Sequence, residues 1–268
     1  MITKIIHYCW FGGKRKPKLV RDCIKSWKKH LPDYEIIEWN EKNSDLSHAF
    51  VQHAYKMKKW AFVADYIRLM VLYENGGVYL DTDMLVLKSL DPFLKDDCFF
   101  GAEDNYLISC GIIGANKKND LVRKCLLKYD LVEVNKDINW HEFVIPIILT
   151  NIFRSEYGYK DSFENEIVKC NDVVIYPTAY FYPFPLSCKN DIINFKNYIR
   201  LESYAVHLWV GSWLPYSEFH YLRTRQYLKG FRLVFNNLLL GEISFKYIRK
   251  VGSSLKQSFT KKSVDTSF

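Results

Sequence analysis

A short apolar run between two glycines and two aspartates most constrains how this 268-residue chain can fold. The run covers residues 78–80, follows the glycine pair 76–77 and leads directly into Asp81 and Asp83. Glycine commonly ends a helix, and short β-branched and aromatic runs form buried strands. Apolar residues recur at helical spacing over 47–75, which predicts two helices before the glycines. The segment therefore predicts a helix, a turn and a buried strand with two carboxylates at its end.

The remainder of the chain alternates in a similar way. An apolar run at 4–11, a helical pattern at 18–30 and a second apolar run at 34–39 give the order strand, helix, strand. This order predicts a parallel α/β unit. Residues 130–200 show little clear pattern apart from one strand. The apolar run 84–87 is expected to continue the strand that begins at residue 78. The other expected elements are strands at 98–102, 108–115, 173–176 and 205–209, a helix at 120–129, and one or two helices after residue 218.

The positive charge is concentrated at the C-terminal end. The chain has 38 Lys and Arg against 30 Asp and Glu, and its 49% hydrophobic residues are typical of a globular protein. Residues 219–268 hold ten of the basic residues and two of the acidic ones, which accounts for the whole net charge of +8. Residues 1–218 therefore carry no net charge, which excludes a broad nucleic-acid-binding surface on this part of the chain. We expect a catalytic domain at 1–218 and a basic amphipathic helical extension at 219–268.

The sequence also bears on location. It has no apolar segment long enough to span a membrane, and its N-terminus lacks a signal-peptide pattern. Its seven cysteines never form a CxxC pair, which favours reduced thiols in the cytoplasm. A basic helix with exposed aromatics is typical of peripheral contact with anionic lipid on the inner face of the cell membrane. The alternative for 219–268 is an ordinary solvated face packed on the body.

The two aspartates suggest metal chemistry. Asp81 and Asp83 stand two residues apart at a strand end, where open α/β sheets place their ligand crevice. Adjacent carboxylates repel each other unless a cation neutralises them, and oxygen ligands suit Mg²⁺ or Mn²⁺. Such a metal can bridge carboxylates to a diphosphate. The alternative is a loop with two solvated acids, since a lone DxD pattern is common.

Three separated blocks resemble one family. They are the first strand at 4–12, the stretch 59–83 with its DxD, and the late block 207–213. Together they resemble the DXD-containing sugar transferases of glycosyltransferase family 32. That family includes fungal initiating mannosyltransferases and bacterial capsular polysaccharide enzymes, and large glucosylating toxins share the signature distantly. The resemblance is weak over 116–200 and absent from the tail.

The resemblance implies a GT-A fold, meaning a Rossmann-like, mostly parallel sheet flanked by helices that binds a nucleotide-sugar. It implies transfer of the sugar with retention of anomeric configuration, with Mn²⁺ or Mg²⁺ as cofactor. Asp65, Arg68 and Asp83 match the catalytic positions, and Asp81, Asp83 and His207 form the implied metal set. The implied contacts to the nucleotide-sugar are Tyr8, Trp10, Asp65, Arg68, Tyr79, Asp81, Ser212 and Trp213.

Each of these residues also has a structural interpretation. Asp65 and Arg68 stand three residues apart, so they can be an ordinary helix pair as well as sugar and diphosphate ligands. Trp10 and His207 can be core side chains, and Trp213 can be a hydrophobic lid residue. Glu103, Asp104, His141 and Glu142 are further candidates for contacts with the acceptor or the anomeric face.

The expected function is metal-dependent transfer of a hexose or N-acetylhexosamine from a nucleotide-sugar. UDP is the expected nucleotide, and the acceptor is expected to be a lipid-linked saccharide in bacterial surface polysaccharide synthesis. GDP-mannose is the alternative donor. Two other classes stay open: a metal-dependent phosphodiesterase or nucleotidyltransferase, which would need further clustered acids, and a non-enzymatic carbohydrate-binding protein.

Overall fold

The computed structural model describes residues 1–133, 138–163, 166–210, 218–223, 225–239 and 244–260. The chain divides into two compact units, Met1–Gly211 and Ser212–Phe268. Within the described residues, every helix is too short or too polar to cross a membrane.

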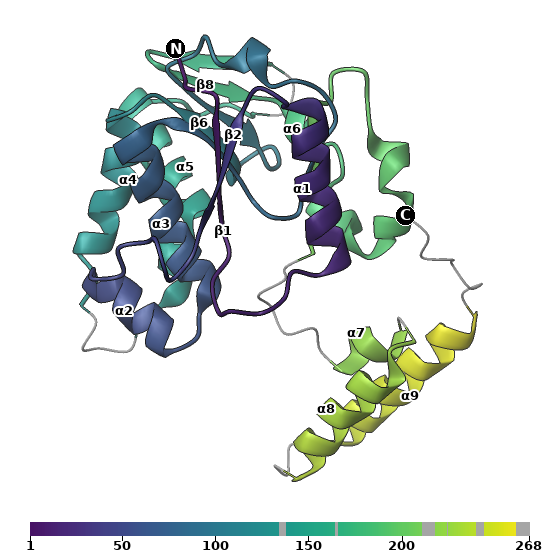
Figure 1. The fold of residues 1–268 in the computed structure, drawn as a ribbon. Helices are drawn as coiled ribbons and strands as arrows, with labels where there is room; N and C mark the ends of the chain where they lie inside the picture. The colour runs from purple at the N-terminus through teal and green to yellow at the C-terminus, as the bar shows by residue number, and fades with distance from the viewer. Residues whose placement is uncertain (134–137, 164–165, 211–217, 224, 240–243, 261–268) are drawn as a thin grey trace. The chain divides into compact units, whose positions relative to one another are not determined.

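The first unit is built on a seven-stranded sheet (Figure 1). Its strand order is β2-β1-β3-β6-β5-β8-β7, and all strands except β6 and β7 run in one direction. The expected α/β fold with a mostly parallel sheet is therefore confirmed. The strands are β1 (Ile5–Cys9), β2 (Glu35–Trp39), β3 (Gly77–Leu80), β5 (Cys98–Ala102), β6 (Ile108–Ala115), β7 (Val168–Cys170) and β8 (Val173–Tyr176).

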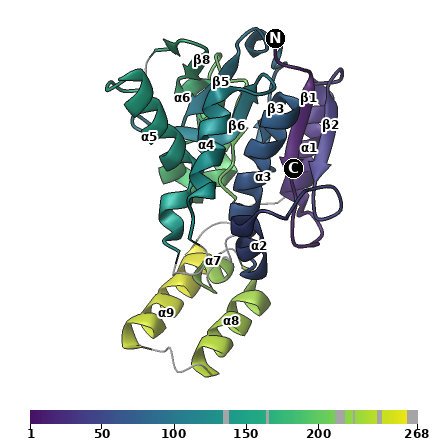
Figure 2. The same ribbon diagram turned by 90° about the vertical axis from the view of Figure 1, so that its left-hand side faces the viewer.

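Helices cover both faces of this sheet. One apolar core lies between the sheet and the layer formed by α2, α3, α4 and α5, and a second core lies between the sheet and α1 with α6. Figure 2 shows the first layer from outside. The helices are α1 (Lys18–His30), α2 (Ala49–Lys56), α3 (Trp60–Asn75), α4 (Asp120–Asp130), α5 (Ile145–Tyr157) and α6 (Thr178–Phe181).

The pleat of β3 decides which layer its side chains meet. Val78 and Leu80 belong to the core on the α1 side, whereas Tyr79 belongs to the core on the α3 side. Successive strand residues point to opposite faces. Asp81, the next odd-numbered position, therefore falls on the same side as α3.

A second, two-stranded sheet adjoins the end of β3. The chain turns at 81–83, where the Met84 N–H donates to the Asp81 carbonyl at 2.9 Å. The apolar run expected to continue the strand becomes β4 (Met84–Val86), which pairs antiparallel with β9 (Ala205–His207). Met84 is paired with His207 in this register. Residues more than a hundred positions apart thus meet beside the two aspartates.

The middle of the chain holds elements that the sequence pattern did not predict. They are the helices α5 and α6, the strand β7 and three 3₁₀ helices, η1 (Asp91–Phe93), η2 (Trp140–Phe143) and η3 (Leu186–Tyr198). The first turns of α5 are almost entirely apolar and bury several side chains, so this helix lacks the polar face that reveals helical periodicity. The strand β7 has only three residues and gives no alternation to detect.

The second unit consists of helices. Three are described where one or two were expected: α7 (Glu218–Arg223), α8 (Tyr227–Leu239) and α9 (Phe245–Thr260). Helix α7 contacts both of the others. A Cβ added to Gly230 of α8 would lie 2.8 Å from the Leu222 side chain, and Arg223 Nε donates to Ser254 Oγ in α9 at 3.3 Å. Close packing on α7 therefore holds α8 and α9 together.

Candidate active site

The polar centre of the first unit lies where β3 ends. Asp81 is anchored by its backbone N–H, which donates to the Gly111 carbonyl of β6 at 2.8 Å. The turn then carries Asp83 away from the sheet and toward β9, where the Leu208 N–H donates to the Asp83 carbonyl at 3.0 Å. The two carboxylates therefore have different hydrogen-bond and ion-pair partners, and they lie in a turn between β3 and β4 instead of on one continuous strand.

Asp81 shares a buried cation with Asp65. The guanidinium of Arg68 lies in α3, and its Nη2 is 3.0 Å from Asp65 Oδ1 and 3.1 Å from Asp81 Oδ1. Its Nη1 donates to the carbonyl of Cys110 at 2.8 Å. The side chain is only 6% exposed, so its charge is compensated by these groups and not by water. Arg68 thus joins α3 to the ends of β3 and β6.

Burial also acts on the partners of Arg68. It raises the pKa of Asp65 to about 7, while the positive charge of Arg68 acts in the opposite direction.

Tyr79 lies beneath the guanidinium of Arg68. The guanidinium carbon is 4.5 Å from the Tyr79 ring centroid, and the Tyr79 hydroxyl donates to Asp81 Oδ1 at 3.2 Å. A cation over an aromatic face gains electrostatic attraction. Tyr79 therefore orients both Arg68 and Asp81.

Asp83 is held by the late block of the sequence. His207 Nε2 lies 3.0 Å from Asp83 Oδ1, and the Val210 N–H donates to Oδ2 at 2.8 Å. Burial acts to raise the pKa of Asp83, but the charge of His207 and these hydrogen bonds lower it overall. Burial likewise acts to lower the pKa of His207, but the Asp83 carboxylate raises it overall. The geometry brings these residues together as a charge-assisted pair.

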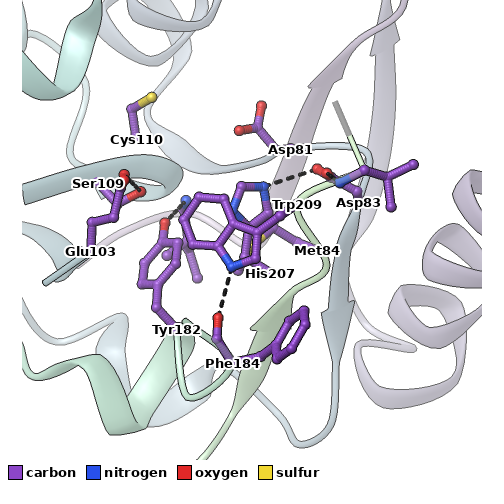
Figure 3. Close-up of polar contacts among 12 residues, drawn as sticks. Asp81, Asp83, Met84, Glu103, Ser109, Cys110, Tyr182, Phe184, His207 and Trp209 are labelled. Carbon is purple, nitrogen blue, oxygen red and sulfur yellow. Dashed lines mark hydrogen bonds and ion pairs between the residues drawn. The ribbon is translucent and has the colours of Figure 1, made fainter. Parts of the chain in front are cut away.

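Trp209 fixes the position of His207. Its indole ring lies edge-on to the imidazole, with ring centroids 4.0 Å apart, and its Nε1 donates to the Phe184 carbonyl at 2.7 Å (Figure 3). Trp209 has a φ of 52°, a region that non-glycine residues seldom occupy. The surrounding contacts hold this backbone in place, as is common near functional sites.

The residues at this centre fit a divalent cation. Asp81, Asp83 and His207 each offer a ligand atom, and these atoms lie within 4.8 Å of one another. Within the described part of the chain, the buried Nδ1 of His207 has no hydrogen-bond partner. Carboxylate oxygens suit Mg²⁺ and Mn²⁺, and imidazole is a common additional ligand of transition metals. The expected metal set is therefore assembled, although its three members come from two distant segments.

A further wall of the site comes from β5 and β6. Ser109 Oγ donates to Glu103 Oε2 at 3.3 Å, and the Tyr182 hydroxyl accepts the Ile112 N–H at 2.9 Å. A Cβ on Gly111 would lie 3.0 Å from that hydroxyl and 3.3 Å from Asp81 Oδ2. Figure 3 shows Glu103 and Tyr182 on the same side of Asp81 as Ser109, away from Asp83. Burial raises the pKa of Glu103.

Sequence reasoning found Glu103 but missed Ser109, Cys110 and Tyr182. No pattern marks them, because strand pairing brings Ser109 and Cys110 of β6 to Asp81, and Tyr182 approaches from the end of α6. The other acceptor candidates behave differently. Asp104 is exposed and accepts backbone N–H groups of its own loop, and His141 and Glu142 are both exposed in η2.

Tyr8 and Trp10 lie at the carboxyl end of β1 but form a separate polar group. The Tyr8 hydroxyl donates to Glu38 Oε2 at 2.6 Å, and Lys16 Nζ reaches the same oxygen at 2.7 Å. Lys16 Nζ also lies 5.7 Å from the Trp10 ring centroid, and the Trp10 Nε1 donates to the Lys14 carbonyl at 2.6 Å. Parallel pairing of β1 and β3 places this group at the same sheet edge as Asp81.

Ser212 and Trp213 lie outside the described residues. The structure gathers six of the predicted residues near the end of β3, in two groups that are each held together by hydrogen bonds or ion pairs, and puts Tyr8 and Trp10 at the neighbouring strand end. The six are Asp65, Arg68, Tyr79, Asp81, Asp83 and His207.

Relatives of known class share this part of the chain. Residues 17–100 match the family model described as the glycosyltransferase sugar-binding region containing a DXD motif. The chain is 26% identical over 169 residues to lactosylceramide 4-alpha-galactosyltransferase of Rattus norvegicus, covering 59% of this chain and 43% of the relative. It spans half or less of the first few curated relatives of this kind.

Two other relatives extend the comparison. An uncharacterized glycosyltransferase of Acanthamoeba polyphaga mimivirus is 28% identical over 235 residues, covering 81% of this chain and 85% of the relative. Inositol phosphoceramide mannosyltransferase 3 of Schizosaccharomyces pombe is 31% identical over 105 residues, covering 35% of this chain and 27% of the relative.

Among solved structures, the galactosyltransferase LgtC with donor and acceptor sugar analogs matches 92% of this chain and 99% of its own, at 15% identity and a TM-score of 0.44. The DXD motif of the matched region corresponds to Asp81 and Asp83, which the structure surrounds with Arg68 and His207. Residues 17–100 therefore match the glycosyltransferase sugar-binding region that contains a DXD motif, and most of the chain is similar to proteins named glycosyltransferases.

Proposed function

We propose that this protein is a metal-dependent, retaining glycosyltransferase. It transfers a hexose or N-acetylhexosamine from a nucleotide-sugar, with UDP as the nucleotide, to a saccharide acceptor. The observation that carries the proposal is the convergence of Asp81, Asp83 and His207 beside the buried Arg68–Asp65 pair. A nucleotidyltransferase would need further acids at the metal, and a carbohydrate-binding module would need no such charge cluster.

In the proposed reaction the bond between the anomeric carbon and the diphosphate oxygen breaks. A bond forms between that carbon and the acceptor oxygen on the same face, and the acceptor proton passes to the leaving diphosphate. A divalent cation held by Asp81, Asp83 and His207 would offset the negative charge that develops on the diphosphate. Arg68 would add positive charge beside it and keep Asp65 and Asp81 in place.

The remaining residues are assigned to substrates by position. Asp65 is proposed to accept hydrogen bonds from sugar hydroxyls, and Tyr8, Trp10 and Tyr79 to contact the nucleotide. Ser212 and Trp213 are proposed to close the diphosphate side. Glu103, which lies beside Ser109 in Figure 3, is proposed to face the acceptor.

The names of the relatives support the donor and acceptor classes. Lactosylceramide 4-alpha-galactosyltransferase and inositol phosphoceramide mannosyltransferase are both named for lipid-linked acceptors. This supports a lipid-linked saccharide as the acceptor here, as in bacterial surface polysaccharide or capsule synthesis. The mannosyltransferase also supports GDP-mannose as the alternative donor. A lipid-linked acceptor agrees with a proposed cytoplasmic location, peripheral to the inner face of the cell membrane, with 219–268 as the contact.

A donor screen tests the proposal directly. Thermal unfolding of the protein is followed with UDP-, GDP- and CMP-sugars, each with and without Mn²⁺. We expect a UDP-sugar to raise the unfolding temperature only when Mn²⁺ is present, because a ligand that binds only the folded state stabilises it. Absence of a Mn²⁺-dependent shift with every donor would contradict the proposal.

The variant Asp83→Asn tests the site. It keeps the side-chain shape but removes one metal-binding charge, so we expect transfer and donor hydrolysis to fall at least about a hundredfold with Mn²⁺ present. The matched control is Asp33→Asn, an exposed aspartate in the turn before β2, which should keep full activity. Activity retained by Asp83→Asn would show that the metal site lies elsewhere.

A further inference from the structure

We propose that α8 and α9 present one continuous amphipathic surface that docks in the plane of an anionic lipid membrane. The inference deepens the proposed membrane contact by naming the side chains that insert and those that bind the headgroups. We call this surface the docking face. Its apolar members are Leu228, Phe231, Phe235 and Leu238 of α8, with Phe245, Ile248 and Phe259 of α9.

The apolar side chains of α8 form a stripe. Leu228, Phe231, Phe235 and Leu238 are spaced by three, four and three residues, which places them along one side of a helix. All four are between 48% and 92% exposed. Burial of large apolar side chains stabilises a fold, so four exposed ones in a line are not explained by the core of the unit.

The opposite side of α8 already has its packing partner. Gly230 is buried against Leu222 of α7, and Leu233 and Val234 are half-buried. Helix α8 therefore has one apolar side that folds the unit and a second that faces outward. Only the side that packs on α7 is needed to hold α8 in the three-helix unit.

Helix α9 repeats the arrangement. Phe245, Ile248 and Phe259 are between 57% and 85% exposed, and a spacing of three and eleven residues keeps them on one side. Ser254 and Ser258 are buried on the other side, where Ser254 accepts the hydrogen bond from Arg223. The hydroxyl of Tyr247 accepts a hydrogen bond from Asn237 of α8 at 3.0 Å, so the two helices are joined directly.

Basic side chains flank the stripes. Arg232 follows Phe231 on α8, and Arg249 and Lys250 follow Ile248 on α9, and all three are exposed. Among the described residues of this unit, Glu218 is the acidic one, and it is buried. Basic residues beside exposed aromatic and aliphatic ones match the anionic headgroups and the acyl boundary of a lipid surface.

The depth of the contact follows from the helix properties. No described helix is long and apolar enough to span a bilayer. We therefore infer that the docking face lies on the membrane surface, with the axes of α8 and α9 parallel to that surface. Each inserted side chain adds apolar burial, while each Lys or Arg adds attraction to anionic lipid. Binding should therefore require both parts of the docking face.

Vesicle sedimentation of the full chain tests the inference. Vesicles of phosphatidylcholine alone are compared with vesicles that also contain phosphatidylglycerol. We expect the protein to bind the second kind about tenfold more tightly, since several basic residues act together. The double variant Phe231→Ser/Phe235→Ser should weaken that binding by about tenfold or more. The double variant Arg232→Gln/Arg249→Gln should weaken it about tenfold and abolish the preference for phosphatidylglycerol.

The matched control is Leu131→Ser/Leu201→Ser, which removes two exposed leucines from the first unit and should leave vesicle binding unchanged. Circular dichroism checks that every variant keeps its helices. Wild-type affinity in the Phe231→Ser/Phe235→Ser variant would overturn the inference. The inference would also be overturned if no protein, the wild type included, bound vesicles and the Phe231→Ser/Phe235→Ser variant changed its oligomeric state. The surface would then join two copies of the chain.

Failure of this inference is separable from failure of the proposed reaction. Vesicle binding needs no sugar substrate, so Asp83→Asn should bind vesicles like the wild type. The Phe231→Ser/Phe235→Ser variant should keep its activity toward a soluble saccharide acceptor and lose activity toward an acceptor embedded in vesicles.

Discussion

Arg68 shows how one side chain can serve both the fold and the reaction. Its guanidinium compensates two carboxylates from different elements and also bonds a backbone carbonyl of β6. A buried charge without a partner costs several kcal/mol, so the three groups depend on one another. The sequence alone allows Asp65 and Arg68 to be an ordinary helix pair. In the structure they form a buried junction between α3 and the ends of β3 and β6.

The variant Arg68→Met tests that junction. It leaves Asp65 and Asp81 without their cation, so we expect the free energy of unfolding to fall by about 3–5 kcal/mol. Urea denaturation followed by circular dichroism measures it. The matched control is Arg123→Met, which breaks the exposed i,i+3 pair with Asp120 and should cost less than about 1 kcal/mol. Equal effects of the two variants would contradict the junction.

His7 supplies a pH dependence outside the candidate site. Its Nε2 lies 2.8 Å from the Gly76 carbonyl and its Nδ1 accepts the Trp39 indole N–H, so the buried ring is bonded in its neutral form. Burial lowers the pKa of His7 below 6.5. The unfolded chain then binds the proton more strongly, and this stability is present above pH 6.5 and lost as the pH falls.

We therefore expect the free energy of unfolding to decrease by about 1–2 kcal/mol between pH 6.5 and pH 5 through this group. Urea titrations across that range measure the slope. The variant His7→Gln cannot titrate and should show a correspondingly flatter profile. A wild-type slope equal to that of His7→Gln would remove His7 as the cause.

Glu103 carries a prediction about the acceptor. The variant Glu103→Gln keeps the hydrogen bond from Ser109 and removes the charge. If the carboxylate faces the acceptor, the KM for the acceptor should rise about tenfold or more, while donor hydrolysis stays within about twofold. Asp104→Asn, an exposed neighbour, is the control and should change neither. A loss of donor hydrolysis in Glu103→Gln would place the carboxylate at the donor instead.

At the level of elements, β6 is built so that aromatic rings can lie against its backbone. A Cβ on Gly114 would stand 1.9 Å from a ring carbon of Phe99 on β5. The ring of Phe99 in turn contacts Phe93 at a centroid distance of 5.5 Å. The strand that carries Ser109 and Gly111 to the site is therefore fixed by packing at its other end.

Gly114→Ala should lower the free energy of unfolding by about 1–3 kcal/mol, because the added methyl displaces a buried ring. Thermal unfolding of the full chain measures the change. Gly252→Ala is the control, since a Cβ there meets nothing within 4 Å and alanine favours the helix. A neutral Gly114→Ala would mean that β5 and β6 adjust their packing easily.

At the level of the whole molecule, the charged centre of the site and the docking face belong to different units. The residues joined at Asp81 and Asp83 all lie in Met1–Gly211, and the docking face lies in Ser212–Phe268. This division agrees with the distribution of charge, since the basic excess lies in the second unit. Apart from the proposed diphosphate contacts Ser212 and Trp213, which fall in the second unit by sequence, donor recognition and surface recognition are thus proposed for separate parts of the chain.

A chain ending at residue 218 tests the division. We expect it to keep the Mn²⁺-dependent thermal shift with a UDP-sugar and to lose vesicle binding. Calorimetry with the donor and vesicle sedimentation measure the two properties. Vesicle binding retained by the shortened chain would move the contact to the first unit. Loss of the donor shift in a chain that still folds would assign part of the donor site to 219–268.

The sequence alone determined the strand before Asp81, the two helices over 47–75, the α/β fold class and the resemblance to DXD-containing sugar transferases, because these depend on local periodicity and on contiguous motifs. Tertiary structure decided the contacts. Pairing of β4 with β9 placed His207 against Asp83, the pleat of β3 turned Asp81 toward Arg68, and pairing of β5 with β6 brought Glu103 to the site. Such long-range contacts follow from how the whole chain packs, and that information is not carried by any single segment.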